Sequence, residues 1–197
     1  MNEYHYHFIE PRIISVQLDP AEFNKERMVQ CVLSQKDLDI TNYHGGYTFE
    51  IIDPYNDFGR LYLKFLSIVN DIFGPFNYST KHKHWCWANV YNRENFVTNM
   101  HDHTTTSTIN GVFYLNVPKD CSDTEGGIKF LINGEEELYV PDEFELLIMP
   151  SYQAHSPQYH SSKENRIAIN MEICTIEEVG QVYLLDRIYK KCTPQKN

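Results

Sequence analysis

The sequence predicts a mainly β fold in which helices pack on one face of a sheet and the β part forms a barrel or jelly roll. Two helical patterns fall within the first 75 residues, and short apolar or alternating runs separated by turn residues begin at Trp85. Aromatic residues make up 14% of the chain, which favours β structure. Helices followed by a series of antiparallel strands are typical of a sheet that is covered by helices.

The N-terminal part predicts one strand and two helices. A strand over residues 12–18 precedes an amphipathic helix over residues 19–36, where Asp19 and Pro20 suit the cap and the first turn. A second helix is predicted over residues 58–73, because apolar side chains recur there at helical spacing and Gly74-Pro75 ends the run. Its apolar positions are Leu61, Phe65, Ile68, Val69 and Ile72.

The second half predicts the strands and the domain organisation. Strands are expected at residues 85–91, 109–117, 128–132, 144–149 and 166–173. Asn133-Gly134 indicates a two-residue hairpin turn between the strand at 128–132 and a stretch that ends at residues 138–140. A short helix near residues 177–189 precedes a tail. We expect a single domain over residues 1–197, with a supporting N-terminal part (1–80), a β core (85–175) and a C-terminal helix and tail (176–197).

Charge and cysteine content exclude several classes of protein. A net charge of −10 argues against binding to nucleic acid, and the short basic segment at residues 81–84 is best interpreted as a solvated turn. Five widely spaced cysteines predict reduced thiols, and no apolar run is long enough to span a membrane. These features predict a cytoplasmic protein. The N-terminal helices either support a homodimer or cover one sheet.

Histidines at predicted strand ends carry the chemical signal. His101 and His103 flank Asp102 just before a strand, and His155 follows another strand. Residues two apart in an extended segment point to the same side, so both His101 and His103 can face one metal ion while Asp102 faces away. The remaining histidines follow no such spacing and are interpreted as ordinary polar residues: His5, His7, His44, His82, His84 and His160.

The spacing of these residues resembles that of the Fe(II)/2-oxoglutarate-dependent oxygenases, because Arg166 follows His155 with ten residues between them. More narrowly, it resembles a branch of these oxygenases that is common in phage and bacterial genomes. The residues that carry the resemblance lie between positions 85 and 173: Trp87 with Asn89, NMHDH (99–103), Gly111 with Tyr114, PSYQAH (150–155), and Arg166 with Asn170.

The resemblance implies a double-stranded β-helix, the cupin-like jelly roll, that hydroxylates a substrate with O2 and releases succinate and CO2. Fe(II) would be bound by His101, His103 and His155, and Arg166 would bind the far carboxylate of 2-oxoglutarate through its planar guanidinium. Tyr114 or Ser107 would add a hydrogen bond to that carboxylate. Asn89, Asn99 and Asn170 are further candidates for contacts around the cosubstrate. The substrate would be a small molecule or a protein side chain, in the host cytoplasm if the chain is phage-encoded.

Three alternatives stay open at this point. In the first alternative, Asp102 replaces one histidine as a metal ligand. It arises because these oxygenases usually have a carboxylate two residues after the leading His of the motif, and His103 occupies that position here. The second is a three-His, cupin-like metalloenzyme that does not use 2-oxoglutarate, against which Arg166 argues. The third is a non-catalytic jelly-roll protein with a structural or binding role.

Overall fold

The computed structural model describes residues 6–10, 12–34, 56–74, 85–93, 99–105, 107–122 and 124–173. The helix predicted near residues 177–189 and the basic segment at residues 81–84 lie outside these ranges. None of the helices in the described part of the chain is long and apolar enough to cross a membrane.

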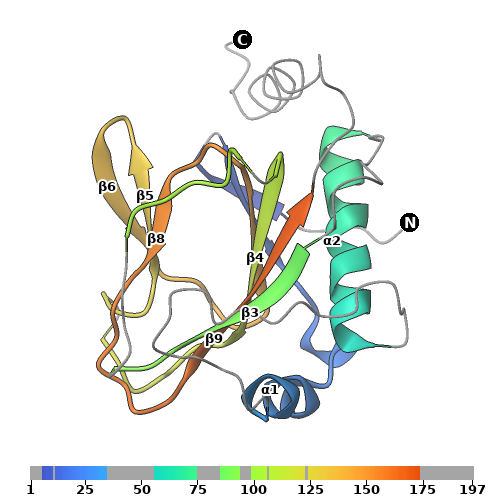
Figure 1. Cartoon of the computed structure of the whole chain (residues 1–197), viewed down its shortest axis with the longest axis vertical. Helices are drawn as coiled ribbons and strands as arrows, with labels where there is room; N and C mark the ends of the chain where they lie inside the picture. The colour runs from blue at the N-terminus through green and yellow to red at the C-terminus, as the bar shows by residue number, and fades with distance from the viewer. Residues whose placement is uncertain are drawn as a thin grey trace.

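In the described part of the chain, two antiparallel sheets face each other (Figure 1). The larger has six strands in the order β1-β2-β7-β4-β9-β3, and the smaller has three in the order β6-β5-β8. This is the jelly-roll arrangement that the sequence predicts. The strands are β1 (Tyr6–Glu10), β2 (Ile13–Gln17), β3 (Trp85–Tyr91), β4 (Ile109–Asn116), β5 (Ile128–Ile132), β6 (Glu135–Tyr139), β7 (Glu145–Pro150), β8 (His155–Pro157) and β9 (Arg166–Ile173).

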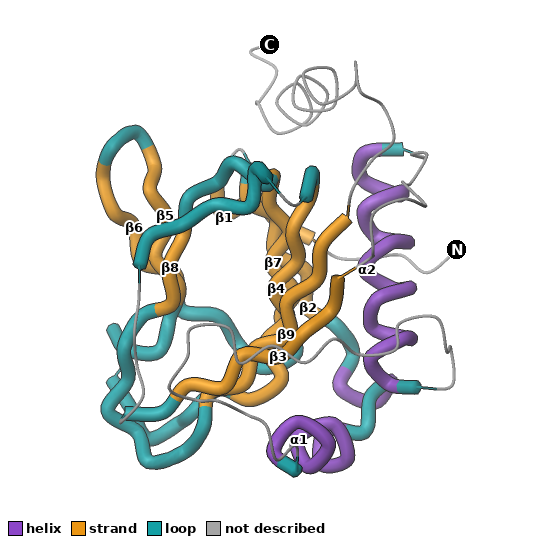
Figure 2. Tube along the Cα trace, viewed as in Figure 1, coloured by secondary structure: helices purple, strands orange, loops and turns teal. Residues whose placement is uncertain are grey.

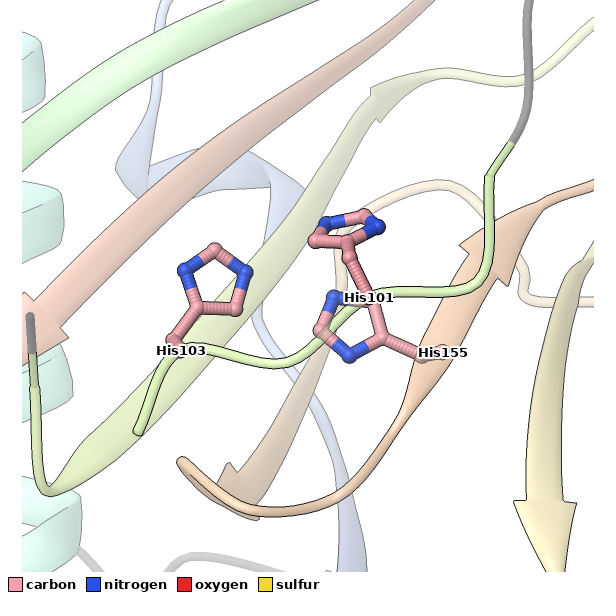
Figure 3. Close-up of side chains that lie close together, drawn as sticks. All are labelled: His101, His103 and His155. Carbon is pink, nitrogen blue, oxygen red and sulfur yellow. The ribbon is translucent and has the colours of Figure 1, made fainter. Parts of the chain in front are cut away.

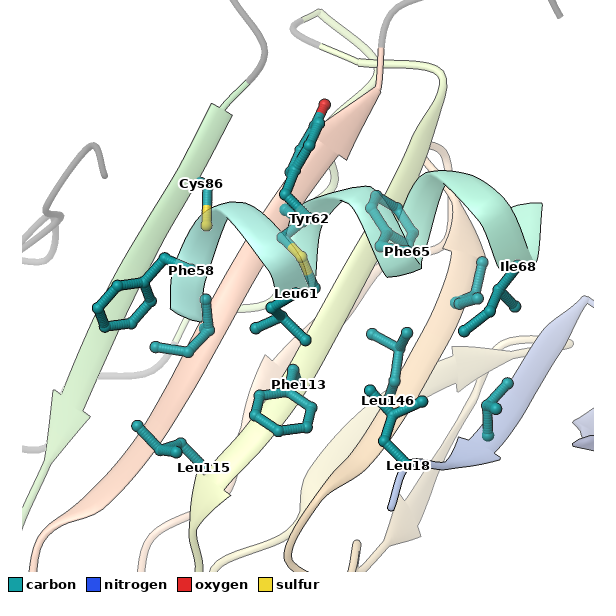
Figure 4. Close-up of a cluster of buried hydrophobic side chains, with 14 of the residues drawn as sticks. Leu18, Phe58, Leu61, Tyr62, Phe65, Ile68, Cys86, Phe113, Leu115 and Leu146 are labelled. Atoms are coloured by element: carbon teal, nitrogen blue, oxygen red, sulfur yellow. The ribbon is translucent and has the colours of Figure 1, made fainter. Parts of the chain in front are cut away.

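Helices cover the outer face of the larger sheet, on the side away from β5, β6 and β8 (Figure 2). Helix α1 spans Lys25–Leu33 and α2 spans Asp57–Phe73. The predicted α2 stripe is buried against side chains from β2, β3, β4, β7 and β9, which form one continuous core with it (Figure 4). The end of α2 is also as predicted, because Gly74 adopts φ 89°, a conformation that glycine accommodates easily.

The helix layer and the sheet approach each other closely at Gly111. A Cβ atom at this position on β4 would lie 2.8 Å from Cε2 of the buried Phe65 ring. Because glycine has no Cβ atom, α2 can pack closely against the middle of the sheet. Gly111, the first residue of the Gly-x-x-Tyr pattern, therefore has a packing role.

Strand alternation gives the larger sheet two different faces. On β4, Phe113 and Leu115 join the core under the helices, whereas Val112 and Tyr114 belong to a second apolar cluster between the two sheets. This second cluster also contains Phe130 from the smaller sheet. The inner face of the larger sheet therefore borders the space between the sheets.

Two predictions about local structure need correction. The helix expected over residues 19–36 is a 3₁₀ turn at Pro20–Glu22 followed by α1, because Asn24 supplies a second N-cap by accepting a hydrogen bond from the Arg27 N–H (3.0 Å). Two strands were also absent from the prediction, β1 and the three-residue β8. The hairpin turn is confirmed, since Asn133 (φ 52°) and Gly134 (φ 89°) both have the positive φ that a type I′ turn requires.

Candidate metal centre

Three imidazoles gather between the two sheets (Figure 3). His101 and His103 come from the segment before β4, and His155 is the first residue of β8. One nitrogen of each ring lies within 4.8 Å of a nitrogen of the other two, which is a spacing that one metal ion can bridge. The His101 and His155 ring centroids are 4.7 Å apart.

Backbone hydrogen bonds hold the two segments together at this point. His101 and His155 form an antiparallel bridge, in which each N–H donates to the other residue's carbonyl at 3.0 and 2.9 Å. The His103 N–H donates to the carbonyl of Ser151 at 2.8 Å. The relative positions of the three side chains are therefore fixed by main-chain pairing, which is what a preorganised binding site needs.

Two of the rings are oriented by neighbouring carbonyl groups. Nδ1 of His101 lies 2.9 Å from the carbonyl oxygen of Asn99, and Nδ1 of His155 lies 2.9 Å from that of Gln153. A carbonyl oxygen only accepts hydrogen bonds, so Nδ1 carries the proton in both rings and Nε2 carries the lone pair. This is the tautomer that presents Nε2 to a metal ion.

The third ring is oriented by a carboxylate instead. Nδ1 of His103 lies 2.6 Å from Oε1 of Glu172 on β9, and only 5% of the Glu172 side chain is exposed. The carboxylate accepts a hydrogen bond from the Nδ1–H group, so Nε2 of His103 also carries a lone pair. All three histidines thus present the same nitrogen.

Burial keeps His155 neutral. Its removal from solvent, helped by the charge of His101, lowers the pKa of His155 to about 3. Only neutral imidazole binds a metal ion, so His155 is ready to act as a ligand throughout the physiological pH range.

Asp102 is exposed, whereas His101 and His103 are partly buried, which agrees with the alternation of side chains in an extended segment. Its exposed carboxylate accepts hydrogen bonds from the Thr104 N–H (3.1 Å) and the Thr104 hydroxyl (2.8 Å). These hydrogen bonds lower the pKa of Asp102. Asp102 is outside the group of potential metal ligands that the described residues form.

A small cavity, partly open to solvent, lies beside the imidazoles. His101, His155 and Arg166 are all in its wall, together with Asn89, Tyr91, Val112, Tyr114, Ile128, Pro157, Ala168 and Asn170. The predicted residues Asn89, Tyr114 and Asn170 therefore share the cavity with two of the histidines. The wall combines a few polar groups with apolar side chains, which is typical of small-molecule sites.

Arg166 is buried in the wall of this cavity and has unpaired hydrogen-bond donors within the described part of the molecule. The residue is 1% exposed, and its Nε and Nη1 atoms find no hydrogen-bond partner among the described residues. The Tyr114 hydroxyl and the Asn170 Nδ2 are also buried without one in this part of the chain. Burial raises the pKa of Tyr114 to about 12, against the opposing effect of the Arg166 charge, so its hydroxyl stays protonated and can donate.

The remaining predicted residues lie elsewhere. Asn99 is exposed and contributes its backbone carbonyl to His101. Ser107 is buried, and its hydroxyl donates to Oδ1 of Asn110. Neither side chain is in the cavity wall.

Glu172 is the residue at this site that the sequence reasoning missed. Side chains of the strand sequence RIAINMEI alternate between the two faces of the sheet. The cavity residues Arg166, Ala168 and Asn170 have even residue numbers. Glu172 continues this series, so period-two alternation predicts a carboxylate on the same face as the cavity. Only the fold reveals that this carboxylate meets His103.

Comparison with known proteins finds similarity at the level of structure. HygX from Streptomyces hygroscopicus, solved with nickel and 2-oxoglutarate bound, has a TM-score of 0.57 at 10% sequence identity, over 84% of this chain and 82% of HygX. A prolyl 4-hydroxylase from Phytophthora capsici has a TM-score of 0.62 at 8% identity, over 94% of this chain and 70% of that protein. A prolyl-4-hydroxylase from Pseudomonas putida has a TM-score of 0.53 at 16% identity, over 82% and 87%.

No protein-family model matches the chain, and neither does any curated protein sequence. At such low identities the structural similarity establishes the fold. The chain therefore has the double-stranded β-helix fold of these proteins, in agreement with the fold that the sequence resemblance implies. Function has to be argued from the site itself.

Proposed function

We propose that this protein is an Fe(II)- and 2-oxoglutarate-dependent dioxygenase that hydroxylates its substrate. Fe(II) would be held by Nε2 of His101, His103 and His155. The arrangement of the donors supports this assignment, because the three nitrogens lie within 4.8 Å of one another and each ring has its Nδ1 engaged elsewhere. Imidazole nitrogen is a suitable ligand for iron, and three protein ligands leave coordination positions open.

The observation that carries the proposal is Arg166. A buried guanidinium with two unpartnered nitrogen atoms is costly, and a carboxylate is the group that satisfies it best, through paired hydrogen bonds. The cavity that contains Arg166 also contains His101 and His155. A dicarboxylate that contacts the metal at one end and Arg166 at the other fits this combination, and 2-oxoglutarate has that form. The Tyr114 hydroxyl and Asn170 Nδ2 supply further donors.

When bound, iron with 2-oxoglutarate and O2 supplies the oxidising chemistry and releases succinate and CO2. The chain's own residues bind and orient. Arg166 and Tyr114 would fix the far carboxylate of the cosubstrate, while the apolar wall residues Val112, Ile128 and Ala168 keep water from that end of the cavity.

The proposed substrate is a small molecule or a protein side chain. Two of the similar structures are prolyl 4-hydroxylases, so a prolyl residue in a peptide is a reasonable first substrate to assay. The net charge of −10 argues against nucleic acid.

The experiment that tests the proposal is an anaerobic titration of the metal-free protein with Fe(II) and then with 2-oxoglutarate. Chelation of Fe(II) by a 2-oxo acid produces a weak visible charge-transfer band. We expect the band in the native protein, no band in His155→Ala, and weaker 2-oxoglutarate binding in Arg166→Ala. Arg60→Ala is the matched control, because Arg60 pairs with Asp57 on the outer helix α2 and should leave both titrations unchanged.

Two other functions predict different titrations. A three-His, cupin-like metalloenzyme would bind Fe(II) without a charge-transfer band and would not respond to 2-oxoglutarate. A non-catalytic jelly-roll protein would bind neither. Either result would refute the proposed dioxygenase.

A further inference from the structure

Glu172 differs from the other groups that orient the three imidazoles. His101 and His155 donate from Nδ1 to neutral backbone carbonyls, whereas His103 donates to a carboxylate at 2.6 Å. That carboxylate is 5% exposed, so solvent does little to weaken its effect on the ring. Of these three Nδ1 contacts, that of His103 is the one made to a charged group.

The position of Glu172 is set by the sheet and by a helix. Strand β9 lies between β3 and β4, and the Glu172 Cα pairs with Trp85 on β3 and with Asn110 on β4. The Tyr62 hydroxyl on α2 donates to the Glu172 carbonyl at 2.7 Å. This backbone is held on three sides, so the carboxylate reaches His103 from a rigid platform.

The charge of the site makes this contact significant. Three neutral imidazoles contribute no charge to a bound divalent metal, whereas a triad with two histidines and one carboxylate contributes −1. His103 stands where the wider oxygenase family usually has that carboxylate, and the narrower branch that the sequence resembles also has a histidine there. Glu172 places a carboxylate on the far side of the same imidazole, one side chain further from the metal.

We infer that Glu172 is a positioning residue that restores the missing negative charge to the metal centre through His103. The inference rests on the proposed function, since it assumes that the three histidines bind the metal. Glu172 fixes the His103 tautomer, and its charge makes Nε2 a stronger electron donor. The pair of His103 and Glu172 thus takes the place of a directly bound carboxylate. Outer carboxylates of this kind change metal affinity about 10- to 100-fold.

A purely structural ion pair is the competing explanation, and Glu172→Gln separates the two. Glutamine keeps the size of the side chain and an oxygen that accepts a hydrogen bond from Nδ1–H, but it lacks the charge. We expect Fe(II) affinity, measured anaerobically, to fall about 10- to 100-fold in this variant. In the Co(II)-loaded protein, the visible ligand-field bands should shift, because His103 becomes a weaker donor.

The matched control is Glu145→Gln. Glu145 is a second buried carboxylate, 4% exposed, but it bonds to Ser15, Tyr139 and the backbone of Asp142. Its replacement should leave Fe(II) affinity and the Co(II) spectrum unchanged. Circular dichroism and thermal unfolding of each metal-free variant show whether it is folded.

A double-mutant cycle with His103→Ala tests whether Glu172 acts through His103. Glu172→Gln should have little further effect on Fe(II) affinity once His103 is removed. Additive losses, or native Fe(II) affinity and Co(II) bands in Glu172→Gln, would overturn the inference while leaving the proposed function intact. Failure of the native protein to bind Fe(II) would overturn both.

Discussion

The two faces of the six-stranded sheet differ in what they do with buried groups. Facing the helices, β9 contributes Ile167, Ile169, Met171 and Ile173 to a closed apolar core. Facing the smaller sheet, the same strand contributes Arg166, Ala168 and Asn170 to the cavity wall. Buried donors without a partner in the described part of the chain occur on this second face, at Arg166 and Asn170.

The helix face therefore contributes mainly to stability, whereas the cavity face is suited to binding a ligand. The helix face gains free energy from burial and close packing, as at Gly111 and Phe65. The cavity face keeps polar groups away from water without satisfying them, which costs free energy until a ligand supplies the partner. Substitutions on the two faces should therefore have opposite effects on stability.

The largest effect is expected on the helix face, from Phe65→Ala. The Phe65 ring is fully buried beneath α2, so its removal leaves a cavity in the core and should lower the free energy of unfolding by about 3–5 kcal/mol. Urea denaturation measures this loss. Fe(II) affinity of the folded variant should be native; a large decrease would mean that the two faces are not independent.

The opposite sign is expected on the cavity face, from Arg166→Leu. Leucine removes a buried charge whose Nε and Nη1 lack partners in the described structure, so the ligand-free protein should gain about 1–3 kcal/mol of stability. Stabilisation of the metal-loaded protein by 2-oxoglutarate should be lost. Thermal unfolding with and without 2-oxoglutarate measures both quantities.

Arg166→Lys is the control for this prediction. Lysine keeps the charge but not the planar pair of donors, so it should retain the stability of the native protein and bind 2-oxoglutarate only weakly. A destabilised Arg166→Leu variant would show that Arg166 supports the fold, and the contrast between the two faces would fail at this residue.

A smaller effect concerns pH and His160, which is enclosed beside the Arg166 end of the sheet and lies 3.2 Å from the Tyr91 carbonyl oxygen. Burial lowers the pKa of His160, and the Arg166 charge lowers it further, although the hydrogen bond to Tyr91 and the charges of Glu125 and Asp120 oppose the shift. The unfolded chain therefore takes up this proton first. Stability should fall as the pH decreases below about 6.5, by at most about 1.4 kcal/mol per pH unit, and level off below the folded-state pKa.

His160→Gln supplies the comparison, because glutamine does not titrate and its amide can still donate to Tyr91. The native protein and the variant should have unfolding free energies that converge as the pH decreases from 7 to 5. Parallel curves would show that the pKa of His160 is the same in the folded and unfolded protein, and that burial does not shift it.

The sequence predicts the longer, periodic elements better than the short strand β8 and the start of α1, and the reason is physical. Helix α2 and strands β5 and β9 follow local apolar periodicity, which is visible in a single segment. Strand β8 has three residues and the start of α1 depends on which Asn or Asp side chain caps it, so neither leaves a strong periodic signal.

The site residues also fall into two groups: those that spacing along the chain indicates and one that only tertiary contact reveals. The spacing of His101, His103, His155 and Arg166 along the chain is enough to indicate a shared function. Glu172 is found only through tertiary contact, because its partner His103 is 69 positions away along the chain. Alternation places Glu172 on the cavity face of β9, but which side chain it meets depends on the register of three strands.

The smallest effect is expected at Asp102, which tests the choice of ligands. Asp102→Asn keeps an oxygen that can accept the hydrogen bonds from Thr104, so the local turn should persist and stability should change by less than about 0.5 kcal/mol. The lost charge is exposed to solvent, where it contributes little to a neighbouring site. Fe(II) affinity should therefore stay within about fivefold of native, since an exposed charge is worth less than about 1 kcal/mol. His103→Ala, which removes a proposed ligand from the adjacent position, should weaken Fe(II) binding far more than Asp102→Asn does. If isothermal titration gave the reverse order, with Asp102→Asn the weaker binder, Asp102 would be the third ligand and His103 would orient it.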